Sequence, residues 1–328
     1  MQDDLLADAI EQLLVGRCTP TEVRAVEGGA SPAALWQALE ESGFADALVP
    51  EAQGGAGLGL KDVLPVFEAC GRHVLPLPLA QTLLARSLLA RAGQEAPVGS
   101  IALAESTPTR ASFVVGYGAV ADWLLLADGL RLRLVDLRRA AREPLGDGSV
   151  DARLSWPLEH TLAFASTLDL RAHEALLLAA QMAGSMRHVF EVTLRYANER
   201  TQFGRSIGKF QAIQHQLSVM AEHTEAARMA VRLSCATAAV IAAPLACAVA
   251  KAVTSSAVVP VTAIAHAVHG AVGITAEYDL QLHTRRLHNW RVAAGSESCW
   301  NERVGRALFS QPQMSLPEFV RTQLGVAG

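Results

Sequence analysis

An apolar run of 28 residues, Leu245–Val272, limits the folds open to this chain more than any other feature. It is long enough to cross a bilayer as an α-helix, which needs about 20 apolar residues. It also contains Lys251, Pro260 and two histidines, which a helix that faces lipid rarely carries. We therefore expect a helix buried among the other helices of a bundle, ended by Gly270 in a left-handed conformation, and no membrane partner.

The rest of the chain changes character twice. Apolar residues recur at helical spacing in the first part and again from about Arg171. Between them, short apolar or alternating runs are separated by Gly, Asp and Pro, which is typical of strands. We expect a mainly α fold with a small β domain: a helical domain at 1–95, a β domain at 96–165 and a helical domain at 166–328. A length of 328 residues is compatible with two or three domains.

Composition and charge exclude several classes of protein. With 51% apolar and 18% charged residues, the chain is not a disordered protein. A net charge of −4 gives no electrostatic reason to bind nucleic acid. The five cysteines are scattered, which indicates reduced thiols, and the acidic N-terminus lacks the basic region of a signal peptide. We expect a cytoplasmic protein.

Two local patterns carry little functional information. The loop Pro50–Gly59 superficially resembles a dinucleotide-binding glycine motif, but no strand precedes it and no acidic residue follows at the required distance. We expect a plain turn there. His266 and His269 share one helical face, but no carboxylate or cysteine completes a metal-binding set, so we expect no metal.

One segment is far more informative. Residues 195–211 read RYANERTQFGRSIGKFQ, which closely resembles the R-x-x-F-G-x-x-I-x-x-F-Q signature of the acyl-CoA dehydrogenase family. Residues 48–59, LVPEAQGGAGLG, are similar to the first helical domain of that family, and residues 269–280, HGAVGITAEYDL, to a later stretch. The resemblance covers both helical domains. It implies the family's α–β–α architecture with a shortened middle β domain and a C-terminal four-helix bundle.

The resemblance implies an FAD-dependent enzyme that oxidises an acyl-CoA thioester to the 2,3-enoyl-CoA. Arg200 matches the arginine that holds the FAD pyrophosphate of a neighbouring subunit, and a guanidinium suits a diphosphate because it is always charged and donates bidentately. The alternative for Arg200 is a surface ion pair with Glu199 or Glu191. The other positions that match cofactor contacts are Gln202, Phe203, Gln211, Gly273 and Ser296.

The catalytic carboxylate departs from the family pattern. Most relatives carry a glutamate in a Y-E-G-T run, which falls on residues 293–296 here, so Ala294 occupies the glutamate position and cannot act as a base. Glu297 is expected to be a first-turn charge of a new helix. A minority of the family keeps the base at the position of Glu174, 29 residues before Phe203. Partial burial would raise the pKa of Glu174 toward that of a general base, whereas the alternative is a solvated first-turn glutamate.

Fewer residues match the family's cofactor contacts than in most relatives. Ala267 and Ala271 replace a glutamine and a glycine of the ADP-binding stretch, and residues 96–165 lack the segments that surround the flavin ring. Such a chain resembles the smaller subunit of heteromeric acyl-CoA dehydrogenases of bacterial steroid and cholate side-chain degradation. The resemblance implies a larger homologous partner in a two-plus-two heterotetramer, FAD at the interface, and an electron-transfer flavoprotein as acceptor. The alternatives are a non-catalytic structural subunit, and a homo-oligomer that binds FAD alone and uses Glu174.

Overall fold

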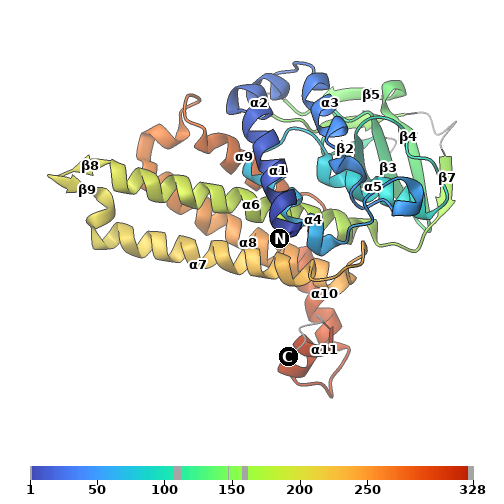
Figure 1. Ribbon diagram of the computed structural model, residues 1–328. Helices are drawn as coiled ribbons and strands as arrows, with labels where there is room; N and C mark the ends of the chain where they lie inside the picture. Colours follow the sequence, from blue (N-terminus) through green and yellow to red (C-terminus); the bar gives the residue numbers. More distant parts are fainter. Residues whose placement is uncertain (1, 107–111, 147, 157–161, 324–328) are drawn as a thin grey trace. The chain divides into compact units, whose positions relative to one another are not determined.

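The computed structural model describes residues 2–106, 112–146, 148–156 and 162–323. Helices precede Ile101, strands lie between Ile101 and Ala165, and helices follow from Leu170 (Figure 1). The prediction of a mainly α fold with a small strand region is confirmed. By their internal contacts the residues form two compact units, whereas the division into three domains stays a prediction. The first unit comprises Met1–Val66, Leu75–Leu177 and Thr237–Ile241, and the second comprises Phe67–Val74, Leu178–Ala236 and Ala242–Gly328.

Five helices make up the N-terminal part of the chain. They are α1 (Gln2–Arg17), α2 (Pro20–Glu27), α3 (Ala33–Glu41), α4 (Leu60–Arg72) and α5 (Leu79–Arg91). The glycine-rich loop between α3 and α4 contains only the short 3-10 turns η1 (Phe44–Asp46) and η2 (Glu51–Gln53), and Gly54 ends the second with φ 89°. The loop is therefore a turn, as expected. Helix α5 is buried along most of its length, which makes it the core helix of this part.

The strands of the first unit form two small sheets. Their bounds are β1 (Ile101–Glu105), β2 (Phe113–Val115), β3 (Trp123–Asp128), β4 (Arg131–Asp136), β5 (Ala141–Pro144), β6 (Ala152–Ser155) and β7 (Leu162–Ala165), with a 3-10 turn η3 (Leu137–Arg139). One sheet has the order β1-β3-β4-β7 and the other the order β2-β6-β5. Strand β1 pairs in parallel with β3, and the other pairs of these two sheets are antiparallel. Periodicity predicted the first four strands and missed the last three.

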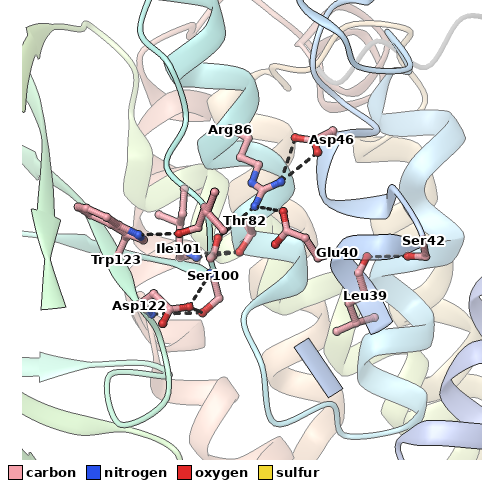
Figure 2. A network of polar contacts seen from close by, with 12 residues as sticks. Leu39, Glu40, Ser42, Asp46, Thr82, Arg86, Ser100, Ile101, Asp122 and Trp123 are labelled. Carbon is pink, nitrogen blue, oxygen red and sulfur yellow. Dashed lines mark hydrogen bonds and ion pairs between the residues drawn. The ribbon is translucent and has the colours of Figure 1, made fainter. Parts of the chain in front are cut away.

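A buried arginine joins three segments of the first unit (Figure 2). Arg86, on α5, is 4% exposed, and its guanidinium donates to both carboxylate oxygens of Asp46 at 3.1 and 3.0 Å. It also donates to Glu40 at 2.6 Å and to the carbonyl of Gly99 at 3.2 Å. These contacts tie α3 and η1 to the residues that lead into β1.

The start of β1 is held by a second group of polar contacts beside the first (Figure 2). The hydroxyl of Thr82 accepts from the backbone N–H of Ile101 at 2.9 Å, and the carboxylate of Asp122 accepts from the backbone and hydroxyl of Ser100 at 2.9 and 3.0 Å. Because buried polar groups are costly unless they are paired, these bonds fix where the strand begins.

The second unit is a helical bundle. Its elements are the part of α6 (Leu170–Glu199) beyond Leu177, β8 (Thr201–Gln202), β9 (Arg205–Ser206), η4 (Ile207–Lys209), α7 (Gln211–Ser234), α8 (Pro244–His269), η5 (Gly270–Ile274), α9 (Leu280–Val292), α10 (Glu297–Phe309) and α11 (Leu316–Gln323). One buried cluster joins α6, α7, α8 and α9 and includes Met186, Met220, Val261 and Leu287. Helices α6, α7 and α8 run side by side in this unit (Figure 1).

Helix α8 has the length and composition to cross a membrane, and it is the one such helix among the described residues. It nevertheless contacts α7, α9 and α10, and Lys251 in its N-terminal third is completely buried. Gly270 ends the helix with φ 63° and ψ −145°, so its φ is positive as glycine allows, but the left-handed helical stop that the sequence predicted is not formed. The packing of this helix within a bundle therefore agrees with the expectation.

Helices α4 and α6 approach each other closely through two glycines of the second unit. A Cβ on Gly71 would lie 1.8 Å from the carbonyl oxygen of Gln181, and one on Gly184 would lie 1.9 Å from that of Glu68. No side chain fits at such distances. These two glycines therefore set the spacing of the crossing.

Candidate functional site

The signature segment forms a hairpin at one end of the bundle. Helix α6 ends at Glu199, and β8 pairs with β9 before α7 begins (Figure 1). The two residues of the turn, Phe203 and Gly204, have φ angles of 51° and 78°. Positive φ at both central residues is typical of a type I′ hairpin turn. The turn places the Phe203 side chain in solvent, 92% exposed.

Arg200 is exposed and makes no ion pair among the described residues. Of the two carboxylates in the alternative, Glu199 and Glu191, that of Glu191 is bonded to Arg72 at 2.8 Å and to Arg187 at 3.0 Å. The backbone of Arg200 is fixed by its N–H, which donates to Tyr196, and by its carbonyl, which accepts from Ile207. The guanidinium is thus left available on a rigid base.

Gln202 and Gln211 lie in the same exposed segment. Gln202 is on β8 and Gln211 is the first residue of α7. Between them the guanidinium of Arg205 lies over the ring of Phe210, 4.2 Å from its centroid. Polar amides, an arginine and an exposed phenyl ring are therefore presented together from one hairpin.

Gly273 lies close to this hairpin, at the far end of α8. The Tyr196 hydroxyl donates to the carbonyl of His269 at 3.4 Å, and the two rings stack, which joins the end of α6 to the end of α8. Gly273 itself is buried, and a Cβ there would lie 2.9 Å from Cβ of His269. Internal packing therefore explains this glycine, and its approach to a cofactor stays a prediction.

Ser296 and Ala294 lie at the other end of α8. The loop that holds them follows α9, whose last turn contacts Lys251, and Lys251 is 18 residues from His269, about 27 Å along a helix. Ser296 occupies the N-cap position of α10, yet its hydroxyl makes no capping bond and has no other partner in the described part of the chain. The structure thus gathers Arg200 and its neighbours at one end of the bundle and Ser296 at the other.

Ala294 has a left-handed backbone with φ 54°. This conformation costs a non-glycine residue about 1–2 kcal/mol. Its methyl group has no ionisable atom, so no base stands at this position. Glu297 opens α10 as expected, and hydrogen bonds from Arg291 lower its pKa.

Glu174 lies one turn inside α6, in the part of that helix that belongs to the first unit. The carboxylate of Asp169 accepts from the backbone N–H of Ala172 at 2.9 Å and thereby caps the helix start. Glu174 is half-buried, and its neighbours His173 and Ala175 are buried. Its environment is therefore that of a partly covered carboxylate, and its role as a base stays a prediction.

Comparison with known proteins identifies the family. Residues 2–97 match the family model "Acyl-CoA dehydrogenase, N-terminal domain", and residues 164–309 match "Acyl-CoA dehydrogenase, C-terminal domain". The acyl-CoA dehydrogenase IpdE2 of Mycolicibacterium smegmatis is 33% identical over 297 residues, which cover 87% of this chain and 92% of that protein. This chain belongs to the acyl-CoA dehydrogenase family.

Other relatives agree with this assignment. The acyl-CoA dehydrogenase IpdE2 of Mycobacterium tuberculosis is 30% identical, over 87% of this chain and 90% of that protein. A solved variant of the Tcur3481-Tcur3483 steroid ACAD shares 26% identity with a TM-score of 0.79, over 94% of this chain and 98% of that chain. The ChsE4-ChsE5 complex from Mycobacterium tuberculosis has a TM-score of 0.81 at 21% identity, over 94% and 97% of the two chains, which shows the fold.

Sequence patterns missed two groups of buried or half-buried polar residues in the second unit. One is Lys251, a single lysine in an apolar helix, whose isolation was the available signal. The other is the stacked pair His188 and His283, whose ring centroids are 4.4 Å apart beside a cavity of about 290 Å³. Burial lowers the pKa of His188 to about 4 and that of His283 well below its usual value, so both rings are neutral at pH 7.

Proposed function

We propose that this chain is a subunit of an FAD-dependent acyl-CoA dehydrogenase that converts an acyl-CoA thioester to the 2,3-enoyl-CoA. The observation that carries the proposal is the exposed hairpin, in which Arg200 has no counter-ion within the part of the chain that the structure describes and Phe203 is 92% exposed. A rigid hairpin that holds a cation and a phenyl ring in solvent is suited to contacts outside its own chain.

The side chains present fit the cofactor. The Arg200 guanidinium offers a planar set of donors for a diphosphate, and the amides of Gln202 and Gln211 add exposed donors and acceptors in the same segment. The uncommitted hydroxyl of Ser296 is a further donor. Since Ser296 and the hairpin lie at opposite ends of α8, we infer that they contact cofactors of different sites in an assembly.

When bound, FAD supplies a hydride acceptor for the β-carbon of the acyl chain. In this chain, the Glu174 carboxylate is the proposed acceptor of the α-proton, because Ala294 offers no acid-base group. Arg200 would bind and orient the diphosphate of one cofactor, and Ser296 would offer its hydroxyl to the cofactor of another site. The Phe203 ring excludes water from the contact that the hairpin makes.

We propose that the partner is a larger homologous subunit and that the acyl group is bulky, such as a steroid side chain. Support comes from two solved relatives, which are the ChsE4-ChsE5 complex and the Tcur3481-Tcur3483 steroid ACAD. An electron-transfer flavoprotein as electron acceptor, and a cytoplasmic location, belong to the same proposal. The second candidate function is a non-catalytic subunit that completes the partner's FAD site. The alanine at position 294 favours it, since this chain then supplies no base.

The test compares two samples: the chain alone, and the chain co-expressed with an acyl-CoA dehydrogenase from a neighbouring gene. Flavin absorbance and the FAD-to-protein ratio are measured for each. Flavin in the complex but not in the lone chain is the expected result. Arg200→Met should weaken FAD binding about 10- to 100-fold, since it removes charge-assisted hydrogen bonds. The matched control Lys209→Met removes an exposed positive charge from the same segment and should leave FAD affinity within about threefold.

A second pair of variants separates the two candidate functions. In the complex, Glu174→Gln should abolish dehydrogenation while flavin content is retained, and the exposed Glu222→Gln should change neither. Full activity of the Glu174→Gln complex would leave the structural subunit as the function. A stoichiometric flavin spectrum from the lone chain would overturn the heteromeric assignment.

A further inference from the structure

Lys251 is a charged residue with no exposed surface, in the N-terminal third of the apolar helix α8. Taking an ammonium group out of water is unfavourable, and an apolar side chain of similar size at such a position is often neutral or stabilising. Stability alone therefore does not account for a lysine here. The contacts of its Nζ atom show which part of the structure the residue stabilises.

Nζ of Lys251 donates to the carbonyl of Trp290 and, at 3.2 Å, to the carbonyl of Arg291. The hydroxyl of Ser255, one turn along α8, donates to the same Arg291 carbonyl at 3.3 Å. Both carbonyls belong to the last turn of α9, where a helix leaves acceptors unpaired and carries partial negative charge. Lys251 is thus a cationic cap that α8 supplies to the end of α9.

The loop after α9 is fixed by bonds from both of its sides. The backbone N–H of Ala293 donates to Asn289 at 3.1 Å, and that of Gly295 donates to Val292 at 3.2 Å. From α10, the indole N–H of Trp300 donates to the carbonyl of Gly295 at 3.1 Å. These hydrogen bonds restrain the loop from both of its flanking helices.

The conformation of the loop includes two features that local folding does not favour. Ala294 has a left-handed backbone, and Ser296 sits at a helix N-cap without using its hydroxyl as a cap. An N-cap serine normally accepts a bond from its own helix. Here the bonds from α8 and α10 hold the loop so that the hydroxyl is not engaged by its own helix.

We propose that Lys251 is the positioning residue of the segment Ala293–Ser296, fixing the end of α9 so that Ser296 presents its hydroxyl to a bound flavin. This inference rests on the proposed function only for the identity of the group that Ser296 meets. The effect of Lys251 on the conformation of the loop needs neither a cofactor nor a partner subunit. The two parts are therefore tested separately.

The first measurement is hydrogen exchange of the full chain, which reports on the loop without a cofactor. Lys251→Met removes the Nζ donor from the carbonyls of Trp290 and Arg291, although Ser255 still donates to the latter, so the amides of Ala293 and Gly295 should exchange about tenfold faster. The control is Thr254→Val, which removes a buried hydroxyl that bonds only within α8. It should leave both amides within about threefold of wild type.

The second measurement is FAD affinity and the visible spectrum of the co-expressed complex. Lys251→Met should weaken FAD binding about tenfold and alter the flavin absorption band. Ser296→Ala should reproduce both changes while the exchange of Ala293 and Gly295 stays at the wild-type rate. Thr254→Val should preserve affinity and spectrum.

Unchanged loop exchange in a folded Lys251→Met chain would overturn the inference. If that variant does not fold, Lys251→Gln replaces it: its shorter, uncharged side chain removes the cationic cap, so faster exchange is expected there too and an unchanged rate has the same meaning. A wild-type complex without flavin would refute the proposed function, and the exchange measurement would still decide the role of Lys251. Faster exchange with unaltered FAD affinity and spectrum would refute the link to Ser296.

Discussion

Phe203 offers the sharpest test of the outward-facing hairpin. Full burial of a phenylalanine side chain stabilises a complex by about 1.5–3 kcal/mol. With 92% of its surface exposed in the single chain, almost all of that free energy is available to an assembly and almost none of it to the chain's own fold. Phe203→Ala should therefore weaken association with the partner subunit about 10- to 100-fold, because each 1.4 kcal/mol changes the dissociation constant tenfold.

The assay is sedimentation of the co-expressed complex over a dilution series, with the FAD-to-protein ratio measured at each step. The melting temperature of the lone variant should stay within about 2 °C of wild type, since few contacts are lost. Phe309→Ala is the matched control, because Phe309 is 82% exposed on α10, outside the hairpin. Association within twofold of wild type for Phe203→Ala would show that the hairpin faces solvent in the assembly, and the reasoning would be wrong.

Three further predictions concern the fold around the site. Arg86→Met leaves two carboxylates without this counter-ion and should cost about 2–3 kcal/mol, which lowers the melting temperature of a chain of 328 residues by about 3–4 °C, whereas the exposed Arg91→Met should shift it by less than about 1 °C. Ala294→Gly relieves the strain of a left-handed backbone. In urea unfolding, its free energy of unfolding should therefore be about 1 kcal/mol higher than that of Ala293→Gly, and equal free energies for the two variants would argue against strain. Burial lowers the pKa of His188 to about 4 in the folded chain, against about 6.5 in the unfolded chain. Between pH 4 and pH 6.5 the unfolded chain therefore binds more protons. Acidification from pH 6.5 to 4 should therefore remove up to about 3 kcal/mol of stability, and His188→Gln should flatten this dependence in urea unfolding.

Local sequence patterns predicted helices and strands correctly where an apolar run or an alternation of apolar residues marked the element. The apolar run around Lys251 became helix α8, and the alternating runs before residue 136 became β1 to β4. Strands β5 and β7 were missed because their residues are mostly exposed and carry no apolar alternation. Their pairing depends on neighbouring strands rather than on their own sequence.

The signature residues could be read from the order of the amino acids because type and spacing identify the family. The absence of a carboxylate at Ala294 was evident in the same way, since a methyl group cannot take a proton wherever it lies. Residue order also indicated Glu174 as the remaining candidate base. None of these conclusions needed a distance.

Three-dimensional packing settled which of these groups are available for binding and which residues support them. Arg200 makes no ion pair among the described residues, and Glu191 is bonded instead to Arg72, a residue more than a hundred positions earlier in the chain. The hairpin and Ser296 lie at opposite ends of α8, and Lys251 meets carbonyls about 40 positions further along. Whether a side chain is exposed, ion-paired or caps a helix depends on neighbours that are remote in sequence. Burial also makes each polar contact stronger, because the protein interior has a low dielectric constant. Only the folded arrangement of the helices therefore determines these properties.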